Sequence, residues 1–137
     1  VLVGAGDIAE CDTQGAAQTA RLLDGIGGTV FTAGDNAYMH GSTAEYACYD
    51  RTWGRHKART YAAPGNHDYE TPNAAGYFGY FGSRVGPGYY AYDVGTWHIV
   101  SLDTMAPSGD GSAQVQWLRS ELQRVRVPCV AAVMHHP

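Results

Sequence analysis

The pattern of hydrophobic and polar positions along this chain predicts short strands that alternate with helices. Runs of strand length, rich in apolar and β-branched residues, lie at 1–5, 29–33, 60–64, 89–94, 97–103 and 129–134. Cap residues and helical spacing predict helices at 13–26, 42–53 and 112–125. Because a helix separates the first two strands, we expect right-handed crossovers and a parallel sheet in this part of the chain.

The stretch from 89 to 103 adds a different kind of unit, because it predicts two strands joined by a tight turn that contains Gly95. Such a hairpin makes the sheet mixed, and the predicted fold class is α/β. Ser42 and Glu45 have the spacing of a capping box at the start of the second helix. The apolar stripe expected to be buried on the last helix consists of Val115, Leu118, Leu122 and Val125.

Composition narrows the class of protein without identifying it. The chain has 137 residues, of which 45% are hydrophobic and 16% charged, so it suits one globular domain. Its net charge of -4 argues against a nucleic-acid surface or an anionic membrane surface, which need a basic patch. No apolar run is long enough for a membrane span. The abrupt start at Val1 and end at Pro137 suggest that residues 1–137 are a single domain truncated at its C-terminus.

The three cysteines allow more than one arrangement. Cys129 lies in an apolar run, where a small buried hydrophobic side chain is expected. Cys11 and Cys48 both follow loops at strand ends and can form a disulfide in an oxidising compartment. Two free thiols are the alternative. A disulfide fits a secreted or periplasmic protein.

Polar residues able to bind a metal follow four of the predicted strands. They are Gly-Asp at 6–7, Gly-Asp-Asn-Ala-Tyr at 34–38, Gly-Asn-His-Asp at 65–68 and His-His at 135–136. In the first three, a Gly comes directly before the ligand-type residue and allows the loop to approach an ion closely. Parallel strands bring these ends to one edge of the sheet. Oxygen and imidazole ligands in one pocket require a cation, and they suit Zn, Fe or Mn better than Ca.

Two simpler interpretations stand beside the metal site. Each of these short motifs taken alone is also typical of a turn. The stretch GAGDIA at 4–9 matches the G-x-G-x-x-A outline of a dinucleotide-binding turn after a first strand. That motif expects an acidic residue about 20 residues further on. Asp35 comes somewhat late and lies within GDNAY, and a nucleotide site would leave GNHD and HHP unexplained.

The motifs GDIA, GDNAY, GNHD and VMHHP, taken in this order, resemble those of the calcineurin-like metallophosphoesterases. The Tyr of GDNAY is similar to that of the purple acid phosphatase branch. The resemblance covers nearly the whole chain. It implies a mixed β-sheet sandwich flanked by helices, of which this chain holds the N-terminal part. It also implies metal-dependent hydrolysis of phosphoesters, with monoesters expected as substrates.

The resemblance further implies which residues hold two metal ions. Asp7 and Tyr38 would bind the first metal, expected to be Fe(III), and Asp35 would bridge both. Asn66 and His135 would bind the second metal, a divalent Zn, Mn or Fe. Two cations about 3.5–4 Å apart neutralise phosphoryl oxygens and lower the pKa of a bound water toward about 7, which supplies hydroxide as the nucleophile.

The remaining candidates concern the substrate, a phosphorylated small molecule or another phosphoester. The resemblance implies that His67 faces the substrate and either protonates the leaving group or holds the phosphate, a role it would share with Asn66. General acid catalysis contributes on the order of 10²–10⁴-fold. His40 follows in the same loop as Tyr38 and is a further candidate for the substrate side, with a solvated loop His as the alternative.

The chain departs from the family pattern at two points. Many relatives have a His where this chain has Ala9, although a small residue there agrees with the use of Tyr38. The later G-H-x-H motif, which supplies one ligand to each metal, does not occur before Pro137. We therefore expect these 137 residues alone to bind metal poorly and to be weakly active or inactive. A relative that has lost catalysis and serves as a binding module is a third alternative.

Overall fold

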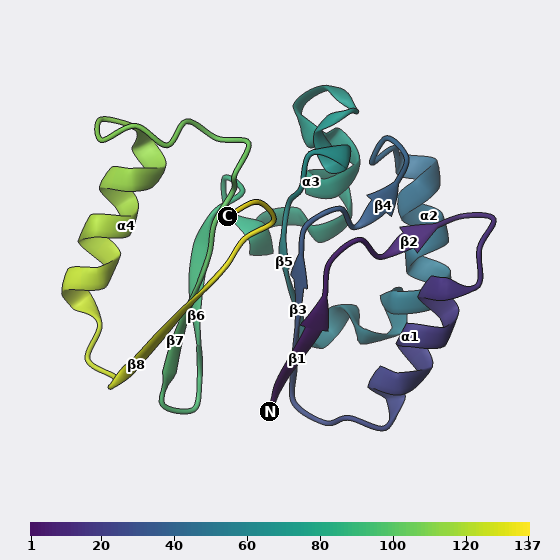
Figure 1. Cartoon of the computed structure of the whole chain (residues 1–137), viewed down its shortest axis with the longest axis horizontal. Helices are drawn as coiled ribbons and strands as arrows, with labels where there is room; N and C mark the ends of the chain where they lie inside the picture. Colours follow the sequence, from purple (N-terminus) through teal and green to yellow (C-terminus); the bar gives the residue numbers. More distant parts are fainter.

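The computed structural model describes residues 1–137, and its layers run helix, sheet, sheet, helix (Figure 1). The first sheet is parallel and has the strand order β1-β3-β5; its strands are β1 (Leu2–Ala5), β3 (Thr29–Ala33) and β5 (Thr60–Ala63). In the second sheet an antiparallel hairpin continues into a parallel pair; its strands are β6 (Tyr90–Val94), β7 (Trp97–Ser101) and β8 (Cys129–Val133). The α/β class, with parallel and mixed sheets between helices, is confirmed.

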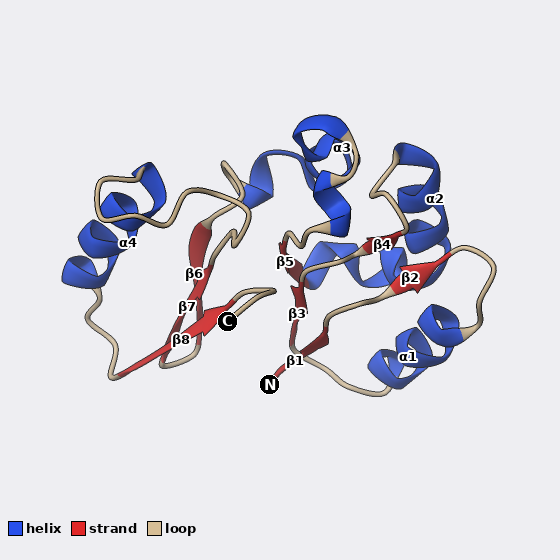
Figure 2. Cartoon of the chain, turned by 45° about the horizontal axis from the view of Figure 1, so that its top comes forward, coloured by secondary structure: helices blue, strands red, loops and turns tan.

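Helices cover the outer face of each sheet (Figure 2). On the side of the first sheet lie α1 (Gly15–Asp24), α2 (Thr43–Thr52) and α3 (Ala75–Phe81). On the side of the second sheet lies α4 (Ala113–Arg124). Two very short strands, β2 (Ala9–Glu10) and β4 (Ala37–Tyr38), pair in parallel beyond the ends of β1 and β3. The 3-10 segments are Trp53–Arg59, His67–Tyr69, Pro72–Ala74 and Gly82–Val85.

The main core lies between the first sheet and its helices. Val30 of β3 and Ala62 of β5 are fully buried there, together with large aromatic side chains of the helical segments. Two of these aromatic residues have partners for their polar atoms: the Trp53 indole donates to Thr19 Oγ1 at 3.0 Å, and the Tyr77 hydroxyl donates to the Ala62 carbonyl at 2.6 Å, whereas the Tyr49 hydroxyl has no partner. The hydrogen bonds offset the desolvation penalty of burying Trp53 and Tyr77.

The capping box at the start of α2 is confirmed. The backbone N–H of Glu45 donates to Ser42 Oγ at 3.3 Å, and the Glu45 carboxylate accepts from the backbone N–H of Ser42 at 2.8 Å. This reciprocal pair satisfies two backbone donors that the helix itself cannot. It also fixes the point at which the chain leaves the loop after β4 and enters the helix.

The stripe expected on α4 is less buried than predicted, because Val115, Leu118 and Val125 are only half-buried. Leu122 is 44% exposed, and the only buried residue of the helix is Gln114. The Gln114 amide accepts from the backbone N–H of Asp103 at 2.8 Å and donates to its carbonyl at 2.9 Å. The helix is therefore anchored at its first turn by polar bonds, whereas helical spacing shows only which residues share a face.

A disulfide joins Cys11 to Cys48, with their Cα atoms 5.3 Å apart. It ties the segment after β2 to helix α2, close to the chain that carries Asp7. Cys129 is a half-buried free thiol rather than a fully buried one. None of the helices combines the length and apolar character that crossing a bilayer requires.

Candidate metal centre

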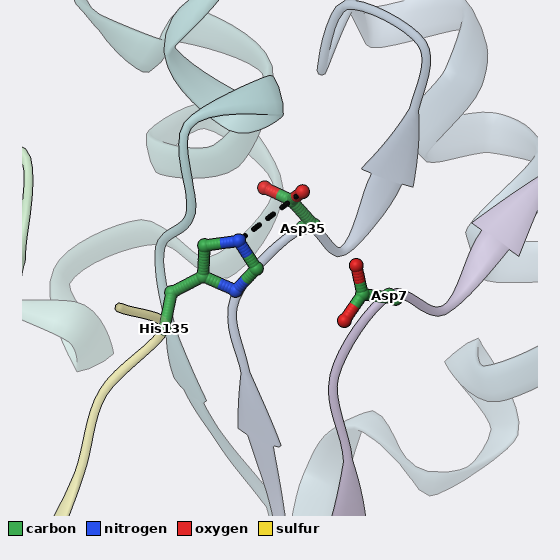
Figure 3. Close-up of side chains that lie close together, drawn as sticks. All are labelled: Asp7, Asp35 and His135. Carbon is green, nitrogen blue, oxygen red and sulfur yellow. Dashed lines mark ion pairs between the residues drawn. The ribbon is translucent and has the colours of Figure 1, made fainter. Parts of the chain in front are cut away.

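Three of the predicted ligands meet at the carboxyl ends of β1, β3 and β8. Asp7, Asp35 and His135 each follow one of these strands and bring their ligand atoms within 4.8 Å of one another (Figure 3). Asp35 is buried at the centre, His135 is half-buried and Asp7 is exposed. The strand ends thus bring these three side chains together, two from the first sheet and one from the second.

The backbone at both aspartates has an unusual conformation. Asp7 has a φ of 54° and Asp35 a φ of 49°, in the left-handed region that residues with a Cβ seldom adopt. Such conformations persist only where the surrounding structure enforces them, and they cluster at functional sites. Here the backbone N–H of Asp7 donates to the Gly34 carbonyl at 3.1 Å, and that of Ile8 donates to the Asp35 carbonyl at 2.9 Å. These bonds hold the two turns side by side, so that both carboxylates leave their strands toward the same point.

Two glycines allow the other segments to approach Asp35. A Cβ on Gly65 would lie 2.2 Å from Asp35 Oδ1, and a Cβ on Gly34 would lie 2.5 Å from the Cβ of His135. Gly34 also has a φ of 82°. Any larger residue at either position would push a candidate ligand away. These glycines thus let the neighbouring segments approach one another closely, whereas the predicted close approach to an ion stays a prediction.

The Tyr38 hydroxyl lies between the two carboxylates. It is 2.5 Å from Asp7 Oδ1 and 2.8 Å from Asp35 Oδ2, so a single phenolic proton faces two acceptors. Burial, together with these bonds and the two negative charges, raises the pKa of Tyr38. In this arrangement the Tyr38 hydroxyl is the one donor that contacts both carboxylates. A metal ion at this point would replace the phenolic proton.

The orientation of His135 also fits a metal ligand. Its Nδ1 lies 2.8 Å from the Ala33 carbonyl, which can only accept, so the ring proton of the neutral form is on Nδ1. Its Nε2 therefore presents a lone pair to Asp35 Oδ2, 3.3 Å away. Two acceptors in such contact are stabilised only by a proton or a cation between them. A backbone carbonyl that fixes the His tautomer is a common feature around metal ligands.

His67 lies beside this cluster. Its backbone N–H donates to Asp35 Oδ1 at 2.9 Å, and its Nε2 is 3.9 Å from Asp35 Oδ2. The ring lies next to that of Tyr38, with centroids 4.5 Å apart, and its Nδ1 is 2.6 Å from the Met39 carbonyl. The predicted substrate-facing His is thus at the edge of the cluster, with its Nε2 turned toward it.

The structure does not bring two other candidates into this network. Asn66 opens the turn that begins at His67, where its carbonyl accepts from the Tyr69 N–H at 3.0 Å, but its side chain makes no hydrogen bond. The His40 ring is exposed and makes no hydrogen bond; only the backbone of His40 is engaged, its N–H by Glu45 and its carbonyl by the Thr71 hydroxyl. Their roles therefore stay predictions.

Asp68 has a role that the sequence did not reveal. Its carboxylate is fully buried and accepts from the Tyr46 hydroxyl at 2.6 Å, the Gly65 N–H at 2.9 Å and the Asn36 side-chain amide at 3.0 Å. It thereby clamps the GDN loop to the GNHD loop. Two of these partners lie 22 and 32 residues away, so spacing could not have indicated them.

Comparison with known proteins identifies the class. A family model described as calcineurin-like phosphoesterase matches residues 3–137, and the chain belongs to this family. A comparison with curated protein sequences gave no match. The chain is therefore a metallophosphoesterase, a phosphoric ester hydrolase whose substrates are phosphoesters and whose chemistry depends on metal. The dinucleotide-binding interpretation of residues 4–9 is set aside, because the family match spans them and Asp7 is directed at the cluster.

Proposed function

We propose that this chain forms a dinuclear site of the purple acid phosphatase type, with phosphomonoesters as substrates. Asp7 and Tyr38 would hold Fe(III), and Asp35 would bridge the two ions. His135 and Asn66 would hold a divalent Zn, Mn or Fe. The disulfide between Cys11 and Cys48 supports a secreted or periplasmic location, where such bonds persist.

The observation that carries this proposal is the position of the Tyr38 hydroxyl. It contacts a carboxylate oxygen of each aspartate, at 2.5 Å from Asp7 and 2.8 Å from Asp35. A phenolate and two carboxylates are hard oxygen ligands, which suit a highly charged ion such as Fe(III).

The second ion is supported by residues on the other side of Asp35. The Nε2 lone pair of His135 faces Asp35 Oδ2, and Asn66 directly follows Gly65, whose closeness to Asp35 brings that loop to the cluster. An imidazole, an amide oxygen and a shared carboxylate suit a divalent transition metal. The two ions, when bound, would neutralise phosphoryl oxygens and acidify a water molecule. Once its Nε2 has taken up a proton, His67 would hold the phosphate or deliver that proton to the leaving group.

The test of the iron assignment is visible absorption of the full-length, iron-loaded protein. A Tyr-to-Fe(III) charge-transfer band is expected, and Tyr38→Phe should abolish it. Tyr69→Phe is a matched control, because its hydroxyl donates to Asp103 at 2.6 Å and lies outside the cluster. A Tyr38→Phe protein that keeps the band of the parent protein would show that Tyr38 is not a ligand.

The substrate class is tested with matched aryl phosphates. Monoester hydrolysis should exceed diester hydrolysis in kcat/KM, and His67→Gln should lower kcat for the monoester by about 10²–10⁴-fold. The metal content of the His67→Gln protein should equal that of the parent, because His67 is not proposed as a ligand. Preference for the diester would refute the phosphomonoesterase proposal while leaving the metal site intact.

A further inference from the structure

Glu45 contacts more of the chain than its place in a capping box requires. Besides the Ser42 N–H, its carboxylate accepts from the Ser42 hydroxyl at 2.7 Å, the Met39 N–H at 2.5 Å and the His40 N–H at 3.2 Å. A capping box needs only the first of these bonds. The others hold the segment between Tyr38 and Ser42, which carries a proposed ligand at one end.

This segment reaches the proposed substrate side through the Met39 carbonyl, which lies 2.6 Å from His67 Nδ1. A carbonyl oxygen can only accept, so the Nδ1 of the neutral ring must carry the proton. Nε2 then keeps its lone pair and faces the cluster, 3.9 Å from Asp35 Oδ2. The position of one peptide therefore decides both the tautomer and the direction of the ring.

We propose that Glu45 is a positioning residue, which sets the tautomer and orientation of the His67 ring by holding the Met39 peptide. Met39 is flanked by two peptide groups. The N–H of each group, on Met39 and on His40, donates to the Glu45 carboxylate. With its N–H groups fixed in this way, the Met39 carbonyl is directed away from α2 and toward His67. The relevance of this ring to phosphoester hydrolysis rests on the function proposed above.

The site requires a carboxylate rather than an amide. Glu45 faces backbone N–H donors and the Ser42 hydroxyl, and none of the backbone groups facing it is an acceptor. Partial burial acts to raise the pKa of Glu45. The hydrogen bonds from Ser42, Met39 and His40 outweigh this effect and lower the pKa. Glu45→Gln would place an amide NH₂ against one of these N–H groups. The side chain would keep its size, so the loss of the bonds is the main change.

The test reads the His67 ring directly by ¹⁵N NMR of histidine-labelled protein, at a pH alkaline enough that its ¹⁵N shifts no longer change with pH. His67→Gln assigns the signal. In the parent protein we expect the Nδ1–H tautomer, and in Glu45→Gln a measurable population of the Nε2–H tautomer. Ser42→Ala is the matched control: it weakens the same helix cap, by about 1 kcal/mol, but keeps the bonds of Glu45 to the loop.

Glu45→Asp provides a second variant if Glu45→Gln does not fold. It keeps the negative charge at the helix N-terminus but is shorter by one CH₂, so it loses the reach to Met39 and should shift the tautomer as well. In the active protein, Glu45→Gln should lower kcat about 10-fold or more and change KM little. Parent-like ¹⁵N shifts of His67 in a folded Glu45 variant, or the same change in Ser42→Ala, would overturn the proposal. A tautomer shift in a protein without phosphatase activity would instead refute only the proposed function.

Discussion

Replacing Asp68 with Ala is expected to lower the free energy of unfolding at neutral pH by about 3 kcal/mol or more. The carboxylate is fully buried, and four donors converge on it: the Tyr46 hydroxyl at 2.6 Å, the Gly65 N–H at 2.9 Å, the Asn36 side-chain amide at 3.0 Å and the Asn36 backbone N–H at 3.3 Å. Alanine would leave the hydroxyl and the two backbone N–H groups without a partner, whereas the Asn36 amide keeps its bond to the Ala63 carbonyl at 2.9 Å.

The magnitude follows from these donors. A buried donor without a partner costs about 1–3 kcal/mol, so three cost about 3–9 kcal/mol, against a total stability of about 5–15 kcal/mol for a typical domain. Burial raises the pKa of Asp68, which means that the carboxylate itself is partly destabilised by desolvation. Removal of the buried charge offsets part of the stability lost with the hydrogen bonds. We therefore expect a loss near the lower end of the range of about 3–9 kcal/mol.

The sign of the pH dependence follows from the raised pKa. Stability from a carboxyl group whose folded pKa is raised is fully present below its unfolded pKa, about 3.9, and is lost as pH rises through the folded value. The difference in stability between the parent and Asp68→Ala should therefore narrow as pH rises from about 4 toward neutrality. Removal of Asp68 should also loosen the contact between the GDN and GNHD loops.

The assay is urea unfolding followed by tryptophan fluorescence, since Trp53 is buried in the same core. With an m-value of about 2 kcal/mol/M, a loss of 3 kcal/mol moves the midpoint by about 1.5 M. Tyr46→Phe is the control, because it removes one donor and should cost less than Asp68→Ala. A midpoint for Asp68→Ala within about 0.5 M of the parent, or a larger shift for Tyr46→Phe, would refute this account of the clamp.

Two further predictions test the approach of the loops and the cross-link. Gly65→Ala should lower metal affinity, because its Cβ would lie 2.2 Å from Asp35 Oδ1, whereas Gly79→Ala in α3 meets nothing within 4 Å and should bind metal like the parent in a calorimetric titration. Equal affinities for the two variants would contradict the proposed geometry. Replacing both Cys11 and Cys48 with Ser should cost about 2–4 kcal/mol and lower the thermal midpoint by about 10 °C, because the disulfide closes a span of 37 residues; a fall of less than about 2 °C would contradict this role.

Much of the fold was predictable because it depends on local patterns. The strands of both sheets, the hairpin and the three longest helices follow from apolar periodicity, and the capping box of α2 follows from two residues three positions apart. The α4 stripe is less buried than predicted for a physical reason. The period of a helix defines its faces, but the depth to which a face is buried depends on the partner, and the only fully buried residue of α4 is the polar Gln114.

The sequence by itself determined the ligand types and their places at strand ends, because Gly-Asp, GDNAY and GNHD are local motifs and parallel strands bring their ends together. Only the tertiary structure decided which atoms meet. It placed the Tyr38 hydroxyl between two aspartates, and it joined Cys11 to Cys48 where two free thiols were also possible. The roles of Asp68 and Glu45 likewise arise from contacts across loops. Such contacts depend on where each loop lies in space, which the spacing along the chain does not specify.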